Sequence, residues 1–127
     1  MNISEVSKEY GLSADTLRYY ERIGLIPTVP RKKSGLRDYD EKACQWVNFI
    51  KCMRGAGLTI ETLIEYVKLF QEGKVTIKAR KKLLLDQRIE LAARIKEMQK
   101  VLAMLDHKID GYEECLMEFE DKLMKKQ

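Results

Sequence analysis

The side chains best suited to chemistry in this sequence are cations crowded into one short stretch. Residues 18–37 carry a net charge of +5, whereas the whole chain of 127 residues carries +4. The basic members are Arg18, Arg22, Arg31, Lys32, Lys33 and Arg37, with Glu21 as the single acidic residue among them. Such a cluster can neutralise the phosphates of a nucleic acid, although charge runs are also typical of an ordinary solvated surface. The elements that hold these side chains must decide between the two interpretations.

The thiols of Cys44, Cys52 and Cys115 are a second source of reactivity. Their number is odd and they include no C-x-x-C pair, so neither a disulfide framework nor a zinc ribbon is expected. A thiolate is the nucleophilic form of cysteine and nearby cations favour it; Lys51 and Arg54 flank Cys52 in the sequence. Cys52 is therefore the candidate reactive thiol. Cys44 falls in the first turn of its expected helix, and Cys115 adjoins an apolar seam where packing is the simpler role.

The remaining residues do not form a catalytic or metal-binding pattern. The single histidine, His107, lies two helical turns before Cys115, which is too sparse a set for a soft-metal site. There is no Gly-rich phosphate loop and no arrangement of nucleophile, base and carboxylate. We therefore expect no enzyme activity, no metal and no cofactor.

The composition predicts a folded domain with an appendage. Hydrophobic residues make up 45% and charged residues 35% of the chain. The longest aliphatic run, Leu83–Leu85, is far shorter than the roughly 20 apolar residues that span a bilayer, and no apolar signal segment opens the chain. We expect a cytoplasmic location and no membrane partner.

Two short helices are predicted at the start of the chain. Ile3, Val6 and Tyr10 recur at helical spacing, with Ser4 as a possible cap, and the pattern stops at Gly11. Ser13 is positioned to cap a second helix that ends near Gly24. Two helices joined by three residues form a helix-turn-helix candidate.

The second of these helices has distinct faces. Leu17 and Tyr20 mark its inward stripe, which turns Thr16, Arg18, Tyr19 and Arg22 outward. These side chain types suit phosphate oxygens and base edges. An ordinary solvated helix face is the competing interpretation.

A small basic hairpin is predicted after this helix. Segments Thr28–Arg31 and Leu36–Tyr39 flank a turn that contains Lys33 and Gly35. Pro30 lacks a backbone donor, so the hairpin must be an edge feature that packs on the neighbouring helices as a wing.

Two further helices complete the first part of the chain. Asp40 is expected to cap one that runs to about Arg54, and Thr59 one that stops before Gly73. On the helix that Asp40 caps, Trp46 lies in the apolar stripe, and Cys44 and Cys52 fall on the opposite flank.

The last third of the chain carries a heptad seam. Apolar residues alternate spacings of four and three, which predicts one helix from about Thr76 to Lys125 and a partner helix to cover it. We expect a homodimer; folding back at Gly111 is the alternative. The seam consists of Leu91, Ile95, Met98, Leu102, Leu105, Ile109, Tyr112, Leu116, Phe119 and Leu123.

These motifs together resemble the DNA-binding domain of MerR-type transcription regulators. The resemblance rests on Ile3-x-Glu5-Val6, on GLSADTLRYYERIGLI at residues 11–26 and on RKKSGLRDYD at residues 31–40. It implies a mainly α fold, with a winged helix-turn-helix DNA-binding domain at residues 1–72. An antiparallel coiled-coil dimerisation helix would follow at residues 73–127.

The resemblance also implies how the chain would work. The second helix would lie in the major groove, and the wing would grip the flanking backbone. The implied DNA contacts are Thr16, Arg18, Tyr19 and Arg22 on the helix and Arg31, Lys33, Arg37 and Tyr39 on the wing. Such regulators bind double-stranded promoter DNA as homodimers, distort it, and thereby act indirectly on RNA polymerase.

The likeness extends to one branch of the family. The run WVNFIKCMR at residues 46–54, with Gly57-Leu58 and the charged C-terminal helix, is most similar to the AdhR/NmlR-like branch, which is associated with responses to reactive aldehydes and related electrophiles. That likeness implies an effector-sensing role for Cys52. A non-covalent small ligand is the alternative effector. From another class, a coiled-coil adaptor for acidic partners is the alternative function.

Overall fold

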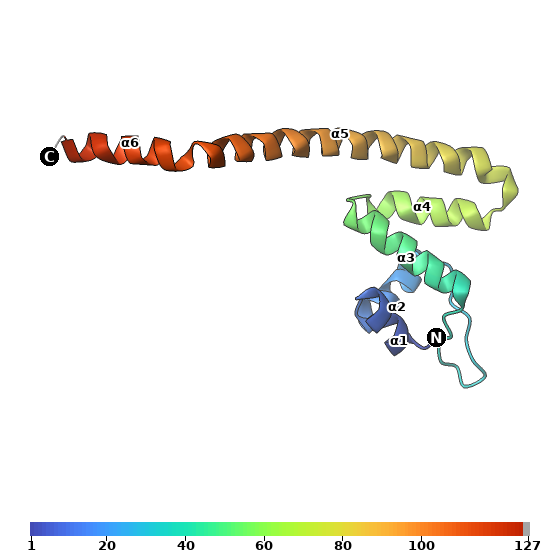
Figure 1. The fold of residues 1–127 in the computed structure, drawn as a ribbon. Coiled ribbons are helices and arrows are strands. Elements are labelled where there is room, and N and C mark those ends of the chain that lie inside the picture. The colour runs from blue at the N-terminus through green and yellow to red at the C-terminus, as the bar shows by residue number, and fades with distance from the viewer. Residues whose placement is uncertain (126–127) are drawn as a thin grey trace. The chain divides into compact units, whose positions relative to one another are not determined.

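The computed structural model describes residues 1–125, without the side chains of residues 115, 116, 124 and 125 (Figure 1). The described elements are α1 (Ile3–Tyr10), α2 (Ala14–Ile23), α3 (Glu41–Gly55), α4 (Ile60–Gln71), the 3-10 turn η1 (Lys74–Thr76), α5 (Ile77–Asp110) and α6 (Tyr112–Lys125). The predicted mainly helical fold with a long C-terminal helix is confirmed. The chain divides into a first unit, Met1–Arg88, and a second that begins at Ile89.

The caps of the first two helices hold the helix-turn-helix in place. Asn2 caps α1 in a capping box, accepting from the Glu5 N–H at 2.9 Å while the Glu5 carboxylate accepts from the Asn2 N–H at 3.0 Å. The expected cap at Ser4 was wrong because the reciprocal partner lies three residues after Asn2. Ser13 caps α2 as predicted, accepting from the Thr16 N–H at 3.0 Å. Gly11 ends α1 in the left-handed region, with φ of 66°.

The core of the first unit joins the helices to the connector after α2. Its most buried members are Val6, Leu17, Leu25, Ile26, Val29, Tyr39, Val47, Ile50 and Leu63. Each such side chain stabilises the fold by about 1.5–3 kcal/mol relative to exposure, which is why so small a domain can hold α2 and the connector after it in fixed positions.

The predicted hairpin is shorter than expected. Its one bridge pairs Arg31 with Arg37, and the turn is closed by a hydrogen bond from the Gly35 N–H to the Lys32 carbonyl at 2.9 Å. The ladder does not extend toward residue 28, because the Val29 N–H donates instead to the Glu21 carboxylate at 2.9 Å. We refer to residues 31–37 as the wing.

Residues beyond α4 still belong to the first unit. The Thr76 hydroxyl donates to the Leu69 carbonyl at 2.6 Å, and the Arg80 guanidinium lies 5.2 Å from the centre of the Phe70 ring. These contacts carry the unit past residue 72 and fix where α5 begins.

The C-terminal helix is interrupted at one residue. Gly111 separates α5 from α6, but its N–H still donates to the His107 carbonyl at 3.3 Å, so the helical course continues. In Figure 1, α6 extends α5 and does not fold back along it. The described seam side chains from Ile95 onward are exposed; Met98 is 69% and Phe119 59% exposed.

Candidate nucleic-acid interface

Three of the four side chains that the sequence analysis assigned to the outward face of α2 are exposed, and the fourth, Thr16, is half-buried. Arg18, Tyr19 and Arg22 are exposed, whereas Leu17 and Tyr20 are buried on the opposite side. The Arg22 guanidinium lies 5.4 Å from the centre of the Tyr19 ring. This cation–π contact holds the Arg22 and Tyr19 side chains next to each other on the surface of α2.

Two of the α2 side chains are also held by the first turn of the helix. The Thr16 hydroxyl lies 2.8 Å from that of Ser13, and the Arg18 guanidinium forms an ion pair with Asp15 at 3.0 Å. Both members of this ion pair are strongly exposed, so it contributes little stability and Arg18 can exchange Asp15 for a phosphate or a base.

The wing is anchored to α2 by a partly buried ion pair. The Arg37 Nε donates to the Glu21 carboxylate at 2.6 Å, and the other oxygen of Glu21 accepts from the Val29 N–H. Burial alone would raise the pKa of Glu21, but the hydrogen bonds from Arg37 and Val29 and the charges of Arg37 and Arg31 outweigh it and lower that pKa. Glu21 is thus an organising residue that the sequence analysis missed, because it was counted only as a charge.

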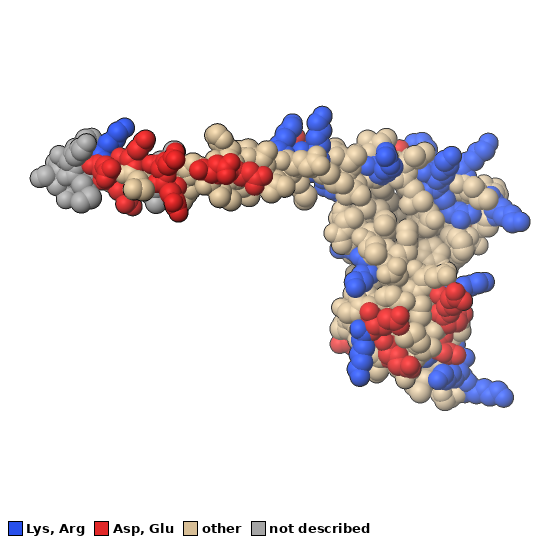
Figure 2. Space-filling view, viewed as in Figure 1, with Lys and Arg blue, Asp and Glu red and all other residues tan. Residues whose placement is uncertain are grey.

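The remaining cations of the wing are differently placed. The Arg31 guanidinium donates to the Gly35 carbonyl at 2.8 Å and so orders the turn. Lys32 and Lys33 are exposed at the tip, and Figure 2 shows basic side chains at that end of the unit. They can meet a phosphate backbone without giving up an ion pair to any described residue.

Tyr39 does not lie where the sequence analysis expected it. Its side chain is 1% exposed, and its buried hydroxyl has no hydrogen-bond partner within the described part of the chain. Burial raises the pKa of this hydroxyl. The sequence analysis expected an exposed side chain, but the alternation along residues 36–39 does not show which face of so short a segment is covered. The implied contact of Tyr39 with the DNA backbone stays a prediction.

The cysteines of α3 occupy two environments. Cys52 is exposed, with its sulfur 3.9 Å from the Asn48 side-chain oxygen. Cys44 is half-buried beside Tyr10 and does not share an open polar flank with Cys52; burial raises the pKa of its thiol. The side chain of Cys115 lies outside the described residues.

The cations beside Cys52 make their contacts elsewhere. The Arg54 guanidinium donates to the Leu58 carbonyl at 2.8 Å, and the Lys51 ammonium lies over Gly11, 3.9 Å from where a Cβ would stand. Sequence adjacency therefore does not produce an ion pair with the Cys52 sulfur. What distinguishes Cys52 is its accessibility at the surface of α3.

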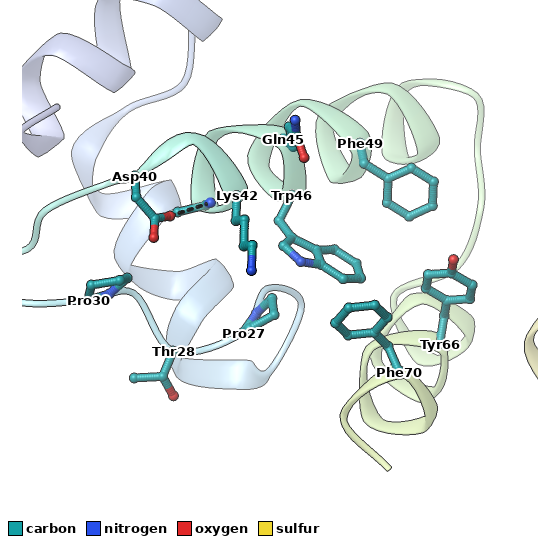
Figure 3. A pocket seen from close by; sticks show the side chains of 11 residues that line it. Pro27, Thr28, Pro30, Asp40, Lys42, Gln45, Trp46, Phe49, Tyr66 and Phe70 are labelled. Carbon is teal, nitrogen blue, oxygen red and sulfur yellow. Dashed lines mark hydrogen bonds between the residues drawn. The ribbon is translucent and has the colours of Figure 1, made fainter. Parts of the chain in front are cut away.

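A pocket that the sequence analysis missed lies between α3, α4 and the connector after α2 (Figure 3). Its volume is about 560 Å³, and Trp46, Phe49, Tyr66 and Phe70 contribute aromatic rings to it. Their spacings of three on α3 and four on α4 were visible in the sequence. Helical spacing alone indicates core packing, so only the meeting of the two helices shows the hollow.

Among the described residues, no group of three or more His, Cys, Asp or Glu side chains is placed to hold a metal ion. In the same part of the chain, no helix combines the length and apolar character needed to cross a membrane.

Comparison with known proteins agrees with this geometry. Residues 1–69 match the model for the MerR HTH family regulatory protein, and residues 44–108 match the model described as MerR, DNA binding. The HTH-type transcriptional regulator AdhR of Bacillus subtilis strain 168 is 63% identical over 91 residues, which are 72% of this chain. The match spans 65% of AdhR, slightly less than two thirds of its length.

Solved structures of MerR family regulators have a similar fold. A MerR family transcriptional regulator from Listeria monocytogenes is 50% identical, with a TM-score of 0.87 over 98% of this chain and 95% of that one. HiNmlR, a MerR family regulator lacking the sensor domain and bound to promoter DNA, is 27% identical, with a TM-score of 0.83 over 89% of this chain and 90% of its own. Each of these relatives is named as a regulator and not as an enzyme.

Proposed function

Because the chain belongs to the MerR family of helix-turn-helix regulatory proteins, we propose that α2 enters the major groove of promoter DNA while the wing holds the flanking backbone. The chain is a DNA-binding transcription regulator of this type. The outward face of α2 carries the proposal, with Arg18, Tyr19 and Arg22 exposed on one side of a helix whose other side is buried. The relative HiNmlR, solved on promoter DNA, supports the same use of the fold.

The proposed contacts divide by role. On α2, Thr16, Arg18, Tyr19 and Arg22 face the groove, where arginine can read base edges or bind phosphates. On the wing, Lys33 and Lys32 bind the backbone, Arg31 shapes the turn, and Arg37 positions the wing through Glu21. A regulator working this way meets its promoter in the cytoplasm.

We infer that two chains pair through the seam of α5 and α6, in antiparallel orientation. Residues 74–88 contain six basic residues and one acidic residue, whereas residues 106–121 contain seven acidic residues and one basic residue. Figure 2 shows the acidic side chains gathered toward the α6 end of the second unit. Antiparallel pairing sets the basic segment of each chain against the acidic segment of the other, and parallel pairing would oppose like charges. The side chain of Leu116, one seam position, lies outside the described residues.

A dimer of this kind would hold two α2 helices at one fixed separation. Phosphate contacts at two half-sites can offset a DNA deformation on the order of 1–10 kcal/mol, so that binding changes the promoter geometry presented to RNA polymerase. The polymerase would respond to the shape of the DNA and need not contact the regulator.

We further propose that Cys52 senses a reactive aldehyde or related electrophile. Its exposure on α3 and the 63% identity to AdhR support this role. The thiolate sulfur would add to the aldehyde carbon, forming an S–C bond. The π electron pair would move to oxygen, which takes up the proton lost by the thiol, giving a hemithioacetal.

A footprint on the DNA that flanks the coding region tests the DNA function. We expect protection of a pseudo-palindrome, with affinity at least about 10³ above nonspecific DNA and falling with salt. Equal affinity for all duplexes would contradict sequence-specific regulation and favour the adaptor function.

Replacing Cys52 by Ser tests the sensing role. With a promoter reporter and added aldehyde, Cys52→Ser should lose induction, while the half-buried Cys44→Ser, a matched thiol control on the same helix, should keep it. Induction unchanged in Cys52→Ser would exclude the thiol as the sensor and leave the DNA function intact.

A further inference from the structure

The aromatic pocket has the volume and lining of a small-molecule site. Its volume of about 560 Å³ lies within the range of roughly 300–1,000 Å³ typical of ligand pockets. We propose that it binds a small planar aromatic carboxylate. The proposed binding does not depend on Cys52 or on DNA.

The rings explain why the ligand should be planar and aromatic. The Trp46 ring centre lies 5.0 Å from that of Phe70, with the planes at 73°, and 6.0 Å from that of Phe49, at 85°. A flat aromatic ring can extend such a cluster by offset stacking or edge-to-face contact. Phe70 is 44% exposed and would gain cover from a bound ring.

The polar end of the pocket explains the carboxylate. Figure 3 shows the Lys42 ammonium and the Trp46 indole nitrogen on the same side of the hollow. Within the described part of the chain, no ion pair engages Lys42 and no hydrogen bond engages the indole N–H. Asp40, which also lines the pocket, accepts from the Ala43 N–H at 2.8 Å through one carboxylate oxygen as the cap of α3. These two donors, one of them charged, can bind the oxygens of a carboxylate.

The pocket also touches the segment that carries the wing. One side of it is lined by Pro27, Thr28 and Pro30. Between them, the Val29 N–H donates a hydrogen bond to the Glu21 carboxylate. A ligand that packs against these prolines would bias the position of the wing. Binding of ligand and DNA would then be coupled, and each would change the affinity of the other by the same factor. This coupling rests on the proposed DNA function, whereas the binding itself does not.

The test uses Trp46, the only tryptophan of the chain, as its own reporter. Benzoate is titrated into the full-length protein while tryptophan fluorescence is recorded. Benzyl alcohol, which has the ring without the charge, and cyclohexanecarboxylate, which has the charge without the aromatic ring, serve as ligand controls. We expect a saturable change with benzoate and weaker binding of both controls.

Paired variants locate the site. Lys42→Gln should weaken benzoate binding about tenfold or more, because a charge-assisted hydrogen bond is removed. Lys51→Gln, the same change nine residues on and so on the opposite face of α3, should leave binding unchanged. Circular dichroism checks that both variants are folded.

The outcomes separate the alternatives. No saturable change, or equal weakening by Lys42→Gln and Lys51→Gln, would overturn the site. A change in Trp46 fluorescence on dilution, together with no response to benzoate, would overturn it in favour of a second copy covering the pocket. Saturable binding that leaves operator affinity unchanged would overturn only the coupling. Failure to bind any operator would contradict the proposed function but not the fluorescence result.

Discussion

Arg18 illustrates how an exposed side chain is kept ready for another partner. Its ion pair with Asp15 holds the guanidinium on the outward face of α2, yet solvent screens both members of the pair. A duplex phosphate or a guanine edge can replace Asp15 at little cost. The pair therefore preorganises the side chain without competing strongly with DNA.

Replacing Arg18 by Ala should lower specific DNA affinity by about 1–3 kcal/mol and relax the preference at one base pair of each half-site. Competition binding with a panel of operator variants measures both effects. Lys96→Ala, an exposed cation on α5, serves as the control and should change neither. If Arg18→Ala retains full affinity and preference, the recognition face of α2 has been assigned wrongly.

Glu21 links two elements through one carboxylate, and its ionised state is the useful one. The lowered pKa of Glu21 means that its stabilising contribution is present at neutral pH and disappears as the pH falls through the ordinary range of a glutamate and below it. Glu21→Gln should reduce the free energy of unfolding by about 1–3 kcal/mol near pH 7, with a smaller loss near pH 3.

Urea denaturation at the two pH values measures this difference. Glu65→Gln, on the exposed side of α4, is the matched control and should have no such pH-dependent effect. An equal loss at both pH values for Glu21→Gln would show that packing, and not the ionised carboxylate, holds the wing.

At the scale of elements, the helices were predictable because each cap is a local event. Ser13, Asp40 and Thr59 each accept a backbone hydrogen bond from three residues further on, as expected. The wing was less predictable, since its length is set by Glu21, eight residues from Val29. The burial of Tyr39 was not predicted for a related reason, because it depends on helices distant in sequence.

We expect the cations of the wing to have different roles, in DNA binding for Lys33 and in stability for Arg37. Lys33→Ala should weaken binding to most duplexes and reduce the slope of log affinity against log salt by about 0.9 for each phosphate that the variant no longer neutralises. Its stability should stay unchanged, since Lys33 is exposed and forms no ion pair with a described residue. Titrations of one operator at several salt concentrations give the slope. An unchanged slope would place Lys33 away from the DNA backbone.

Arg37→Ala should behave differently from Lys33→Ala. Because Arg37 is paired with Glu21 and only partly exposed, its removal should lower the free energy of unfolding by about 1–3 kcal/mol. A urea melt compares the two variants directly. If Arg37→Ala instead retains its stability and reduces the salt slope as Lys33→Ala does, Arg37 binds a DNA phosphate in the complex and not Glu21.

At the scale of the whole molecule, the proposed dimer rests on two features: the exposed apolar seam is the reason for a partner helix, and the charge pattern is the reason for its antiparallel direction. Matching the basic segment at residues 74–88 to the acidic segment at residues 106–121 of a second chain places the twofold axis near Glu97. Met98 would then lie beside its own counterpart. Phe119 would lie about 66 Å from its counterpart, at 1.5 Å of rise per residue along the helix.

Disulfide trapping distinguishes the two orientations. In a background with the three native cysteines replaced by Ser, Met98→Cys should form an intermolecular disulfide under mild oxidation, since the two Cα atoms can approach within about 7 Å. Phe119→Cys, a matched apolar seam position, should not. A parallel dimer brings both positions together, so cross-linking of both variants would refute antiparallel pairing, and cross-linking of neither would show that the seam is not shared between two chains in this register. The separation of the two α2 helices, and with it the spacing of the operator half-sites, follows from which result is obtained.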